Sequence, residues 1–532
     1  MKKRKLWFGL AALAAGWSFD FLFWGRQGGL SFLVWTVLLL VLGYVLAWSE
    51  KKKPSVWSIV LTVLILGFAV IPAWRSEGFT RFTSTMVTLL GLLLLISTFL
   101  DGHWLYFRVV DFITRLFTSI GAGFTRGFGL LAFDENGVPP LPGQKTKTRR
   151  IGSIVLGIVM ALPIVIMLGA ILASADPIFS DTLRDIFDLE NLPEYLFRFT
   201  YIIIGAYFIL GLLLHAILPN KTAEKPETNK ATMKPFLGWT ECAIVLGAVN
   251  ILFILFVVIQ MKYLFGGTAN ITAAGYTYSE YARRGFGELV AVAVISLALY
   301  LVMNTIMKRE SKGSFVGFTV LSVLMMANVL IMLASSLQRL MLYESAYSFS
   351  ELRTYTHVFI FWLAALILAT IVFQIINRQG RFGLALMLMI VGFTATLGIM
   401  NVDGFVARQN IKLELTDASK VINDRARLDV NYLATLSSDA VPVLVEAFKD
   451  PTLSSDTHDL LGVTLACRTK EFMNAEENDW QSIRFGELRA KKLLLENRSL
   501  WGSYVVTKDE YGYDSVMLGN DEYSCYGYDW MD

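Results

Sequence analysis

The sequence predicts an all-α protein: a polytopic helical membrane protein with about eleven transmembrane helices and a small, mainly helical C-terminal extracytoplasmic domain. Hydrophobic residues make up 55% of the 532 residues and charged residues only 17%, whereas charged residues are about 25% of an ordinary soluble domain. The charge also divides the chain. Residues 1–401 contain 33 Lys and Arg against 21 Asp and Glu, and residues 402–532 contain 14 against 23. A basic membrane part is therefore joined to an acidic tail.

Eleven apolar runs are long enough to cross a bilayer. A crossing helix needs about twenty apolar residues, because no backbone polar group can be left without a partner in lipid. The first run follows a basic N-terminus as in a secretory signal, but it ends in aromatic residues, so we expect it to be retained. The predicted spans are Leu6–Phe23, Leu30–Trp48, Val56–Trp74, Phe82–Leu100, Ile151–Ala173, Phe199–Leu218, Cys242–Phe265, Phe286–Met307, Phe315–Leu337, Val358–Ile376 and Gly383–Asn401.

Basic residues in the loops predict the orientation. The N-terminus and alternate connecting segments contain 23 Lys and Arg, and the other set contains 10. Because basic loops stay in the cytoplasm, the N-terminus is expected inside, and an odd number of spans places the C-terminus outside. We therefore expect four parts: a four-helix block over 1–100, a cytoplasmic interfacial segment over 101–150, a seven-helix block over 151–401, and an extracytoplasmic domain over 402–532.

Residues 104–131 decide this topology. They are apolar, but Arg108, Asp111 and Arg115 recur on one stripe of a helix. That pattern is typical of an amphipathic helix lying in the membrane interface with its charges toward water. If this segment crossed the membrane instead, every later orientation would reverse. The glycines at 123 and 127 form a small-residue spacing that favours close helix packing.

The tail changes to short amphipathic patterns after Asn401. Ser438 and Asp439 followed by a proline predict the start of one helix, because capping side chains and an early proline suit the first turn. Two more helices are predicted over Thr457–Phe472 and Trp480–Leu495, and residues 501–532 are expected to be strand or irregular. Cys467 and Cys525 are both in the tail, where an oxidising compartment would permit pairing; the spacing alone leaves this open. A tyrosine-rich surface for sugar or protein binding is an alternative to a plain structural domain, with Tyr511, Tyr513, Tyr523, Tyr526 and Tyr528 as its residues.

Polar side chains near the predicted outer membrane face form the candidate site. Ionisable groups at this depth are costly unless paired, so they either serve a function or fix the helix ends, and both interpretations remain open. At helical spacing, Glu280, Arg284 and Glu288 would stack as an ion ladder. The candidate residues are Asp20, Gln260, Tyr263, Glu280, Tyr281, Arg283, Arg284, Glu288, Arg339, Tyr343, Glu344 and Arg353.

Signatures of enzymatic chemistry are missing from the sequence. The four histidines, at 103, 215, 357 and 458, have no metal-binding spacing, and no phosphate loop or nucleophile elbow occurs. We therefore name no catalytic residue, and we expect no metal, no cofactor and no nucleic-acid partner. No charged residue lies near the centre of a span, which disfavours a proton-coupled transporter.

Several segments resemble an uncharacterised family of bacterial multi-pass membrane proteins, a domain of unknown function. The resemblance implies a bacterial plasma membrane and transfers no functional residue. The segments are residues 19–25, 260–267, 278–289, 339–344 with 351–353, 401–410 and 479–490.

Three classes of function remain open. The first is a non-enzymatic sensor, regulator or envelope-assembly protein, for which the bilayer and a membrane or envelope protein are the expected partners. The second is a transporter or lipid-handling protein that uses the outer polar cluster. The third is a membrane-embedded transferase or hydrolase, for which Glu280 and Glu288 are the only carboxyl pair to nominate.

Overall fold

The structure is a computed structural model of the chain. It describes residues 2–132, scattered residues between 161 and 179, and residues 192–217, 235–264, 286–308, 311–417, 429–475, 479–519 and 521–525.

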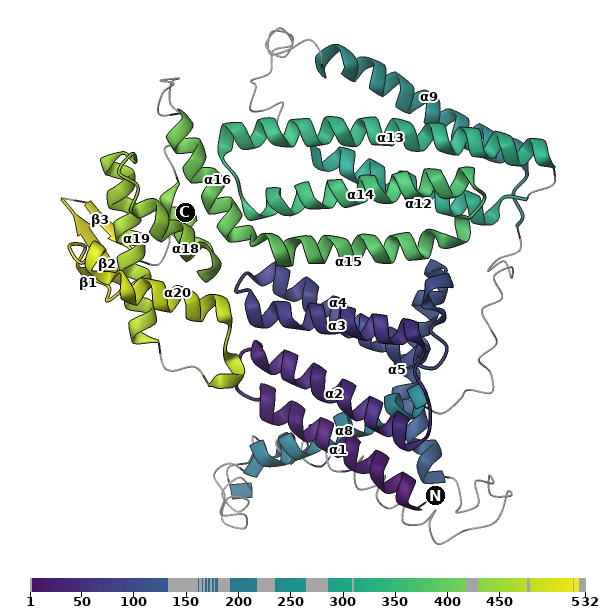
Figure 1. The fold of residues 1–532 in the computed structure, drawn as a ribbon, viewed down its shortest axis with the longest axis horizontal. Coiled ribbons are helices and arrows are strands. Elements are labelled where there is room, and N and C mark those ends of the chain that lie inside the picture. Colours follow the sequence, from purple (N-terminus) through teal and green to yellow (C-terminus); the bar gives the residue numbers. More distant parts are fainter. Residues whose placement is uncertain are drawn as a thin grey trace.

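Ten helices of the described residues are long and apolar enough to cross a membrane. They confirm ten of the eleven predicted spans; the remaining one, Ile151–Ala173, lies outside the described residues except for scattered positions. Figure 1 shows the helices running side by side in two bundles, which meet where α4 packs against α15. The first bundle contains α1 (Lys2–Phe23), α2 (Leu30–Ser49), α3 (Val56–Trp74), α4 (Gly78–Thr98) and α8 (Leu192–Ile217). The second contains α9 (Trp239–Leu264), α12 (Phe286–Ile306), α13 (Lys312–Tyr347), α14 (Glu351–Ile375) and α15 (Phe382–Met400).

Helix α13 is much longer than a bilayer requires. Its 36 residues correspond to about 54 Å, against about 30 Å of hydrocarbon. Helix α13 therefore extends past the membrane core, and the last three turns carry Arg339, Tyr343 and Glu344 toward the C-terminal domain. This end of the helices, where the domain binds, is called the domain face below, and the other end is called the opposite face.

Helix α5 (Val109–Ala132) follows η1 (His103–Tyr106) and crosses the helix ends at the opposite face (Figure 1). It is not among the candidate spans of the described residues. Helix α5 packs closely on α8, as the spacing of Gly123 and Gly127 predicted. This contact requires glycine, because a Cβ at Gly211 of α8 would lie 2.1 Å from the carbonyl oxygen of Gly123. The placement of α5 in the cytoplasmic interface stays a prediction.

The membrane part ends at Asn401, whose left-handed backbone (φ 56°) separates α15 from α16 (Val402–Asp417). Asparagine tolerates this conformation, and its Oδ1 accepts a hydrogen bond from the Gly404 N–H at 3.1 Å. Helix α16 thereby turns into the C-terminal domain and packs against α18 (Val441–Phe448).

The C-terminal domain is mainly helical, as predicted. Around α18 lie α17 (Val430–Thr435), η3 (Ser438–Ala440), α19 (Ser455–Asn474), α20 (Phe485–Glu496) and η5 (Arg498–Trp501). Leu444, Leu465 and Leu494 are fully buried between these helices. The predicted helix Trp480–Leu495 is wrong in one respect: η4 (Trp480–Ser482) and α20 are separate elements. The helix is interrupted where the Ile483 carbonyl accepts a hydrogen bond from the Leu30 N–H of the first bundle at 3.0 Å.

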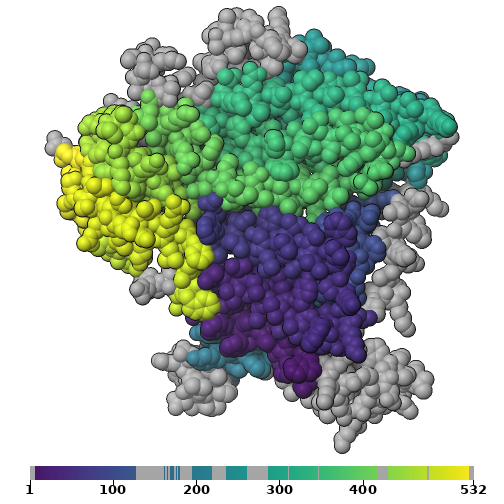
Figure 2. Space-filling view, viewed as in Figure 1, coloured from purple at the N-terminus to yellow at the C-terminus, as the bar shows by residue number. Residues whose placement is uncertain are grey.

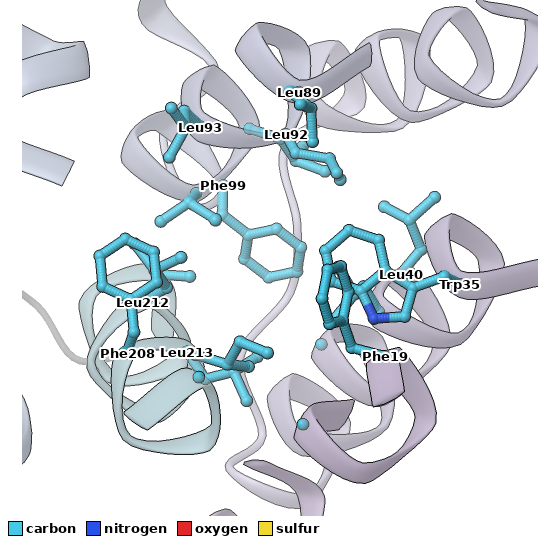
Figure 3. Close-up of a pocket in the computed structure, with 18 of the residues that line it drawn as sticks. Phe19, Trp35, Leu40, Leu89, Leu92, Leu93, Phe99, Phe208, Leu212 and Leu213 are labelled. Atoms are coloured by element: carbon cyan, nitrogen blue, oxygen red, sulfur yellow. The ribbon is translucent and has the colours of Figure 1, made fainter. Parts of the chain in front are cut away.

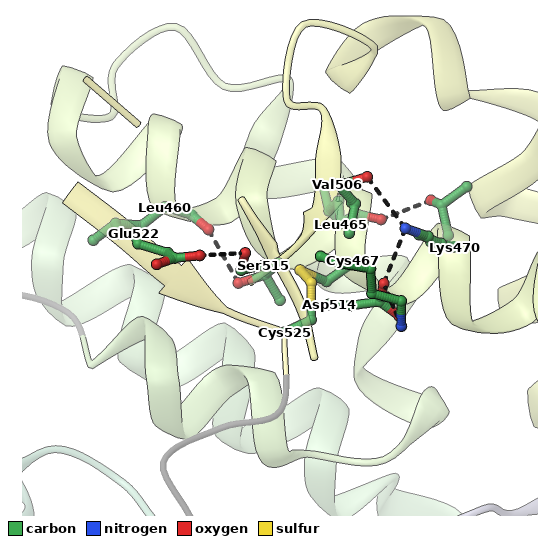
Figure 4. The surroundings of a disulfide bond; sticks show 12 residues. Leu460, Leu465, Cys467, Lys470, Val506, Asp514, Ser515, Glu522 and Cys525 are labelled. Carbon is green, nitrogen blue, oxygen red and sulfur yellow. Dashed lines mark hydrogen bonds and ion pairs between the residues drawn. A yellow bond between two sulfur atoms is a disulfide. The ribbon is translucent and has the colours of Figure 1, made fainter. Parts of the chain in front are cut away.

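A small antiparallel sheet closes the domain, in the region predicted to be strand or irregular. Its strands are β1 (Val506–Lys508), β2 (Asp514–Leu518) and β3 (Asp521–Ser524), in the order β1-β2-β3, with Val516 opposite both Val506 and Tyr523. Cys467 of α19 and Cys525 after β3 form a disulfide, which ties the sheet to the helices (Figure 4). The space-filling view shows the domain packed against the ends of both bundles (Figure 2).

A candidate site where the domain meets the membrane helices

The predicted site residues fall into two separate groups. Asp20 is on α1, which packs against α2 and α8, whereas Tyr343, Glu344 and Arg353 are on α13 and α14 of the other bundle. The remaining predicted residues Glu280, Tyr281, Arg283 and Arg284, and the Tyr263 side chain, lie outside the described part of the structure.

Asp20 is buried and fully paired. Arg198 of α8 donates two hydrogen bonds to its carboxylate, at 3.0 and 2.6 Å, and the Tyr201 hydroxyl donates a third. The Arg198 guanidinium also lies 5.3 Å from the centre of the Trp24 ring. A bidentate Arg–carboxylate pair of this kind fixes the geometry of two neighbouring helices. The partners were missed because α8 begins seven residues before the predicted span, so that Arg198 appeared to lie in a loop.

Arg353 closes the turn between α13 and α14. Its guanidinium lies 4.2 Å from the centre of the Tyr343 ring and donates to the carbonyl oxygens of Tyr347, at 2.9 Å, and Ser348. Glu344 is buried and lies 3.1 Å from Nδ1 of His357. Arg339 lies on α13, the buried Gln260 lies on α9, and Glu288 is exposed on α12. The contacts of Arg353 and Glu344 hold helix ends together.

Sequence reasoning missed a set of buried and half-buried carboxyl groups that lies where the domain meets the helices. We call Glu77, Glu351, Asp403 and Asp439 the carboxyl junction. Glu77 precedes α4, Glu351 begins α14, Asp403 begins α16 and Asp439 is in η3. The junction therefore joins both bundles to the domain.

Glu77 caps α4 and also binds the second bundle. Its Oε2 accepts a hydrogen bond from the Thr80 N–H at 2.8 Å, which satisfies one of the free donors of the first turn. The Tyr355 hydroxyl of α14 donates to Oε1 at 2.6 Å. A single buried carboxylate thus connects α4 to α14.

Asp439 connects the domain to the first bundle. Its Oδ2 accepts hydrogen bonds from the backbone N–H groups of Ser76, at 2.7 Å, and Glu77, at 3.4 Å. Burial raises the pKa of Asp439, while these two hydrogen bonds and the nearby Arg75 guanidinium act in the opposite direction. The Asp439 carbonyl accepts from the Asn401 side chain at 3.1 Å, so the end of α15 is held at the same point.

Asp403 and Glu351 bring two carboxyl groups against each other. Asp403 is fully buried, and its Oδ2 accepts a hydrogen bond from the Ser437 N–H at 2.8 Å. The Glu351 carboxyl faces it, and the Glu351 N–H donates to the Tyr432 hydroxyl at 2.9 Å. This contact brings the first turns of α14 and α16 together.

Arginines surround the carboxyl junction. Arg75 donates to the carbonyls of Gly398 and Ile399 at 2.8 and 2.9 Å and so caps α15. Arg81 donates to the Gly28 carbonyl at 2.8 Å. Arg484 of the domain pairs with Glu487 at 2.9 Å and also donates to Gln27.

Several buried polar atoms around the junction have no hydrogen-bond partner in the described residues. Buried polar atoms are nearly always paired with protein groups or ordered water. The atoms are Ser76 Oγ, Thr80 Oγ1, Arg81 Nε, Asp403 Oδ1, Gln481 Oε1 and Arg484 Nε. Within the same described residues, no three His, Cys, Asp or Glu side chains are grouped as metal ligands.

One feature of the sequence could have indicated part of the carboxyl junction. Glu77 and Asp403 each follow the end of a predicted span, on loops predicted to share a membrane face. Asp439 resembled an ordinary capping residue of a domain helix, because its partner Ser76 is 363 positions away.

Comparison with known proteins gives one family. The model of a domain of unknown function, DUF4153, matches residues 62–447, which include α4, the second bundle and all four residues of the carboxyl junction. No curated protein and no solved structure matches the chain significantly.

Proposed function

This chain belongs to the DUF4153 family, a domain of unknown function, and from its own geometry we propose that it is a non-enzymatic regulatory or envelope-assembly protein of the bacterial plasma membrane. The observation that carries the proposal is the carboxyl junction. A partner that binds the domain can act on both helix bundles, because Asp439 and Glu77 connect η3, α4 and α14 through buried hydrogen bonds.

The proposal places the domain outside the cytoplasm. Lys51, Lys53, Arg378 and Arg381 lie at the opposite face from the domain, as the positive-inside rule requires for a cytoplasmic side. The Cys467–Cys525 disulfide supports the same orientation, since disulfides persist mainly in oxidising compartments.

Thiol labelling of intact cells tests this orientation. Tyr511→Cys places a thiol on an exposed position of the domain, and Lys53→Cys places one on an exposed position of the opposite face. The native cysteines give little background, since two are paired and Cys242 is buried. A membrane-impermeant maleimide should label Tyr511→Cys in intact cells and Lys53→Cys only after lysis. The reverse pattern contradicts the orientation.

Photo-crosslinking tests the role. A photoreactive residue at Tyr511 or Tyr513, both exposed on the domain, should form a discrete adduct with another envelope protein, whereas one at the lipid-facing Val63 should not. A full-length chain that purifies alone and forms no adduct from either domain position contradicts a regulatory or assembly role.

A lipid-handling or transport function is the second candidate. The Asp20–Arg198–Tyr201 cluster favours it, because the cluster lies beside an apolar groove of the first bundle. The full-length protein in vesicles should then move a fluorescent phosphatidylethanolamine between leaflets, and Arg198→Ala should abolish the movement without loss of folded protein. Equal movement in protein-free vesicles excludes this candidate.

A further inference from the structure

The first bundle contains an apolar groove that its helices do not fill. The groove has a volume of about 430 Å³ and is partly enclosed by α1, α2, α4, α5 and α8. Phe19, Trp35, Leu92, Phe99 and Phe208 surround its centre (Figure 3). This volume falls within the range of small-molecule sites, about 300–1,000 Å³, and far exceeds the voids that a packed protein interior leaves.

Among the described residues, no polar side-chain atom of the groove is available to a polar ligand. The lining is aliphatic, aromatic or glycine, and its polar side-chain atoms already have partners: the Tyr44 hydroxyl bonds Thr62, Tyr201 bonds Asp20, and the Trp35 N–H points to the Ala15 carbonyl at 3.5 Å. Apolar cavities stay dry and accept apolar ligands. The occupant is therefore hydrocarbon.

The groove has the length and depth of a lipid chain. On α8 it is lined from Tyr201 to Ile217, which corresponds to about 24 Å of helix. Both residues belong to a membrane-spanning helix, so the groove runs within the hydrocarbon core, which is about 30 Å thick. Acyl chains of the bilayer are the hydrocarbon present at that depth.

The end of the groove near the domain face provides charges of both signs. Arg198 lies 3.5 Å from Glu194 and also pairs with Asp20, while Glu194 accepts a hydrogen bond from the Trp24 indole at 2.8 Å. Tryptophan at this level is typical of the headgroup region. Because the two carboxylates outnumber the guanidinium, this end disfavours a net anionic headgroup and suits one that carries both a phosphate and an amine.

We propose that the first bundle binds a zwitterionic phospholipid, with one acyl chain in the groove and its headgroup beside Glu194 and Arg198. The binding site goes beyond the proposed function and does not depend on it. A bound chain completes the packing around the groove between the described helices of the bundle.

Two glycines allow the groove to be filled without disturbing its walls. A Cβ at Gly43 or Gly205 meets no atom within 4 Å, and both residues line the groove. Gly43→Leu and Gly205→Leu should therefore project into the space a chain would occupy. Gly67→Leu is the matched control, since its Cβ is equally free but faces away from the groove on α3. Leucine favours helix over glycine at all three positions.

Native mass spectrometry of the full-length protein tests the proposal. After delipidation and addition of phosphatidylethanolamine, the wild type and Gly67→Leu should retain one tightly bound lipid, and both groove variants should show at least a tenfold lower occupancy. Phosphatidylethanolamine should raise the apparent Tm of the wild type and of Gly67→Leu, and it should leave the apparent Tm of both groove variants unchanged. Retention by both groove variants equal to that of Gly67→Leu overturns the proposal. So does wild-type retention of phosphatidylglycerol equal to that of phosphatidylethanolamine. If one groove variant fails to accumulate, the other decides the test.

Discussion

The carboxylate of Asp439 accepts a hydrogen bond from the backbone N–H of Ser76 at 2.7 Å, although the two residues are 363 positions apart. Ser76 lies in the short loop between two membrane helices, and Asp439 lies in the first turn leading into α18. This contact makes the C-terminal domain part of the membrane structure instead of an appended body.

Gly486→Ala should weaken the attachment of the domain. A Cβ at this position would lie 2.3 Å from Oδ1 of Asp439 and 3.0 Å from the Trp74 carbonyl. Overpacking of this kind costs about 1–3 kcal/mol, even though alanine is the better helix former by about 1 kcal/mol. The apparent Tm of the purified protein should therefore fall. Gly247→Ala, at a helical glycine with open space around its Cβ, should leave it equal or higher, and a fall of the same size there would contradict the explanation.

Tyr355→Phe should uncouple α14 from the cap of α4. The lost hydroxyl donates to the buried Glu77 carboxylate at 2.6 Å, and hydrogen bonds to charged groups contribute about 1.5–3 kcal/mol. Thermal unfolding should show the loss. A double-mutant cycle with Glu77→Gln should give a coupling energy well above zero, while Tyr106→Phe, at an exposed ring, should be neutral. Additive effects of the two junction variants would show that the contact contributes nothing.

Removing the disulfide should destabilise the domain. Cys467 and Cys525 are 58 positions apart, and a loop of that length corresponds to about 4 kcal/mol of loop-closure entropy. The double variant Cys467→Ser with Cys525→Ser should become sensitive to protease between α19 and β3, within a chain that still inserts. Intact wild-type protein should bind two equivalents of maleimide only after reduction. Labelling of both residues without a reductant would exclude the bond.

Acid should loosen the sheet of the domain through Asp514. Hydrogen bonding to Lys470 at 2.9 Å (Figure 4), and also to Lys508 at 3.1 Å, lowers the pKa of Asp514 below 3.8. The pKa of Asp514 is lower in the folded state than in the unfolded state. The stability that Asp514 contributes is therefore complete above the pKa of the unfolded state, and it is lost as the pH falls through the pKa of the folded state. Asp514→Asn should reduce the stability near neutral pH and flatten its acid dependence below about pH 4. If the stability of Asp514→Asn depended on acid pH as that of the wild type does, the dependence would come from other carboxyl groups.

The membrane helices were predictable because lipid imposes one rule on every span. Runs such as Val56–Trp74 agree with the structure to the residue, since unpaired backbone groups are forbidden throughout the hydrocarbon. The start of α18 was also predictable from Pro442 in its first turn, but the predicted capping by Ser438 and Asp439 is wrong: no side chain caps α18, and the Asp439 carboxylate binds the Ser76 and Glu77 amides instead. Local patterns carry no information about distant partners, however.

The candidate site was less predictable for that reason. Position near the membrane face selected Asp20 and Arg353, but not Arg198 and Tyr201, the partners of Asp20. Glu77 and Asp403 each appeared as a single charge at a span end, and only the packing of α4, α14 and α16 brings them together. The length of α13 was underestimated because its last turns are polar and lie outside the lipid.

Hydrogen–deuterium exchange of Asp439→Ala tests most directly whether the domain and the membrane helices form one unit. The substitution removes the acceptor of the Ser76 and Glu77 amides, so exchange should accelerate at least tenfold in the peptide covering residues 75–81 as well as around residue 439. Glu446→Ala, an exposed position on α18, should change neither. Acceleration confined to the domain, with residues 75–81 as protected as in the wild type, would contradict the junction described here.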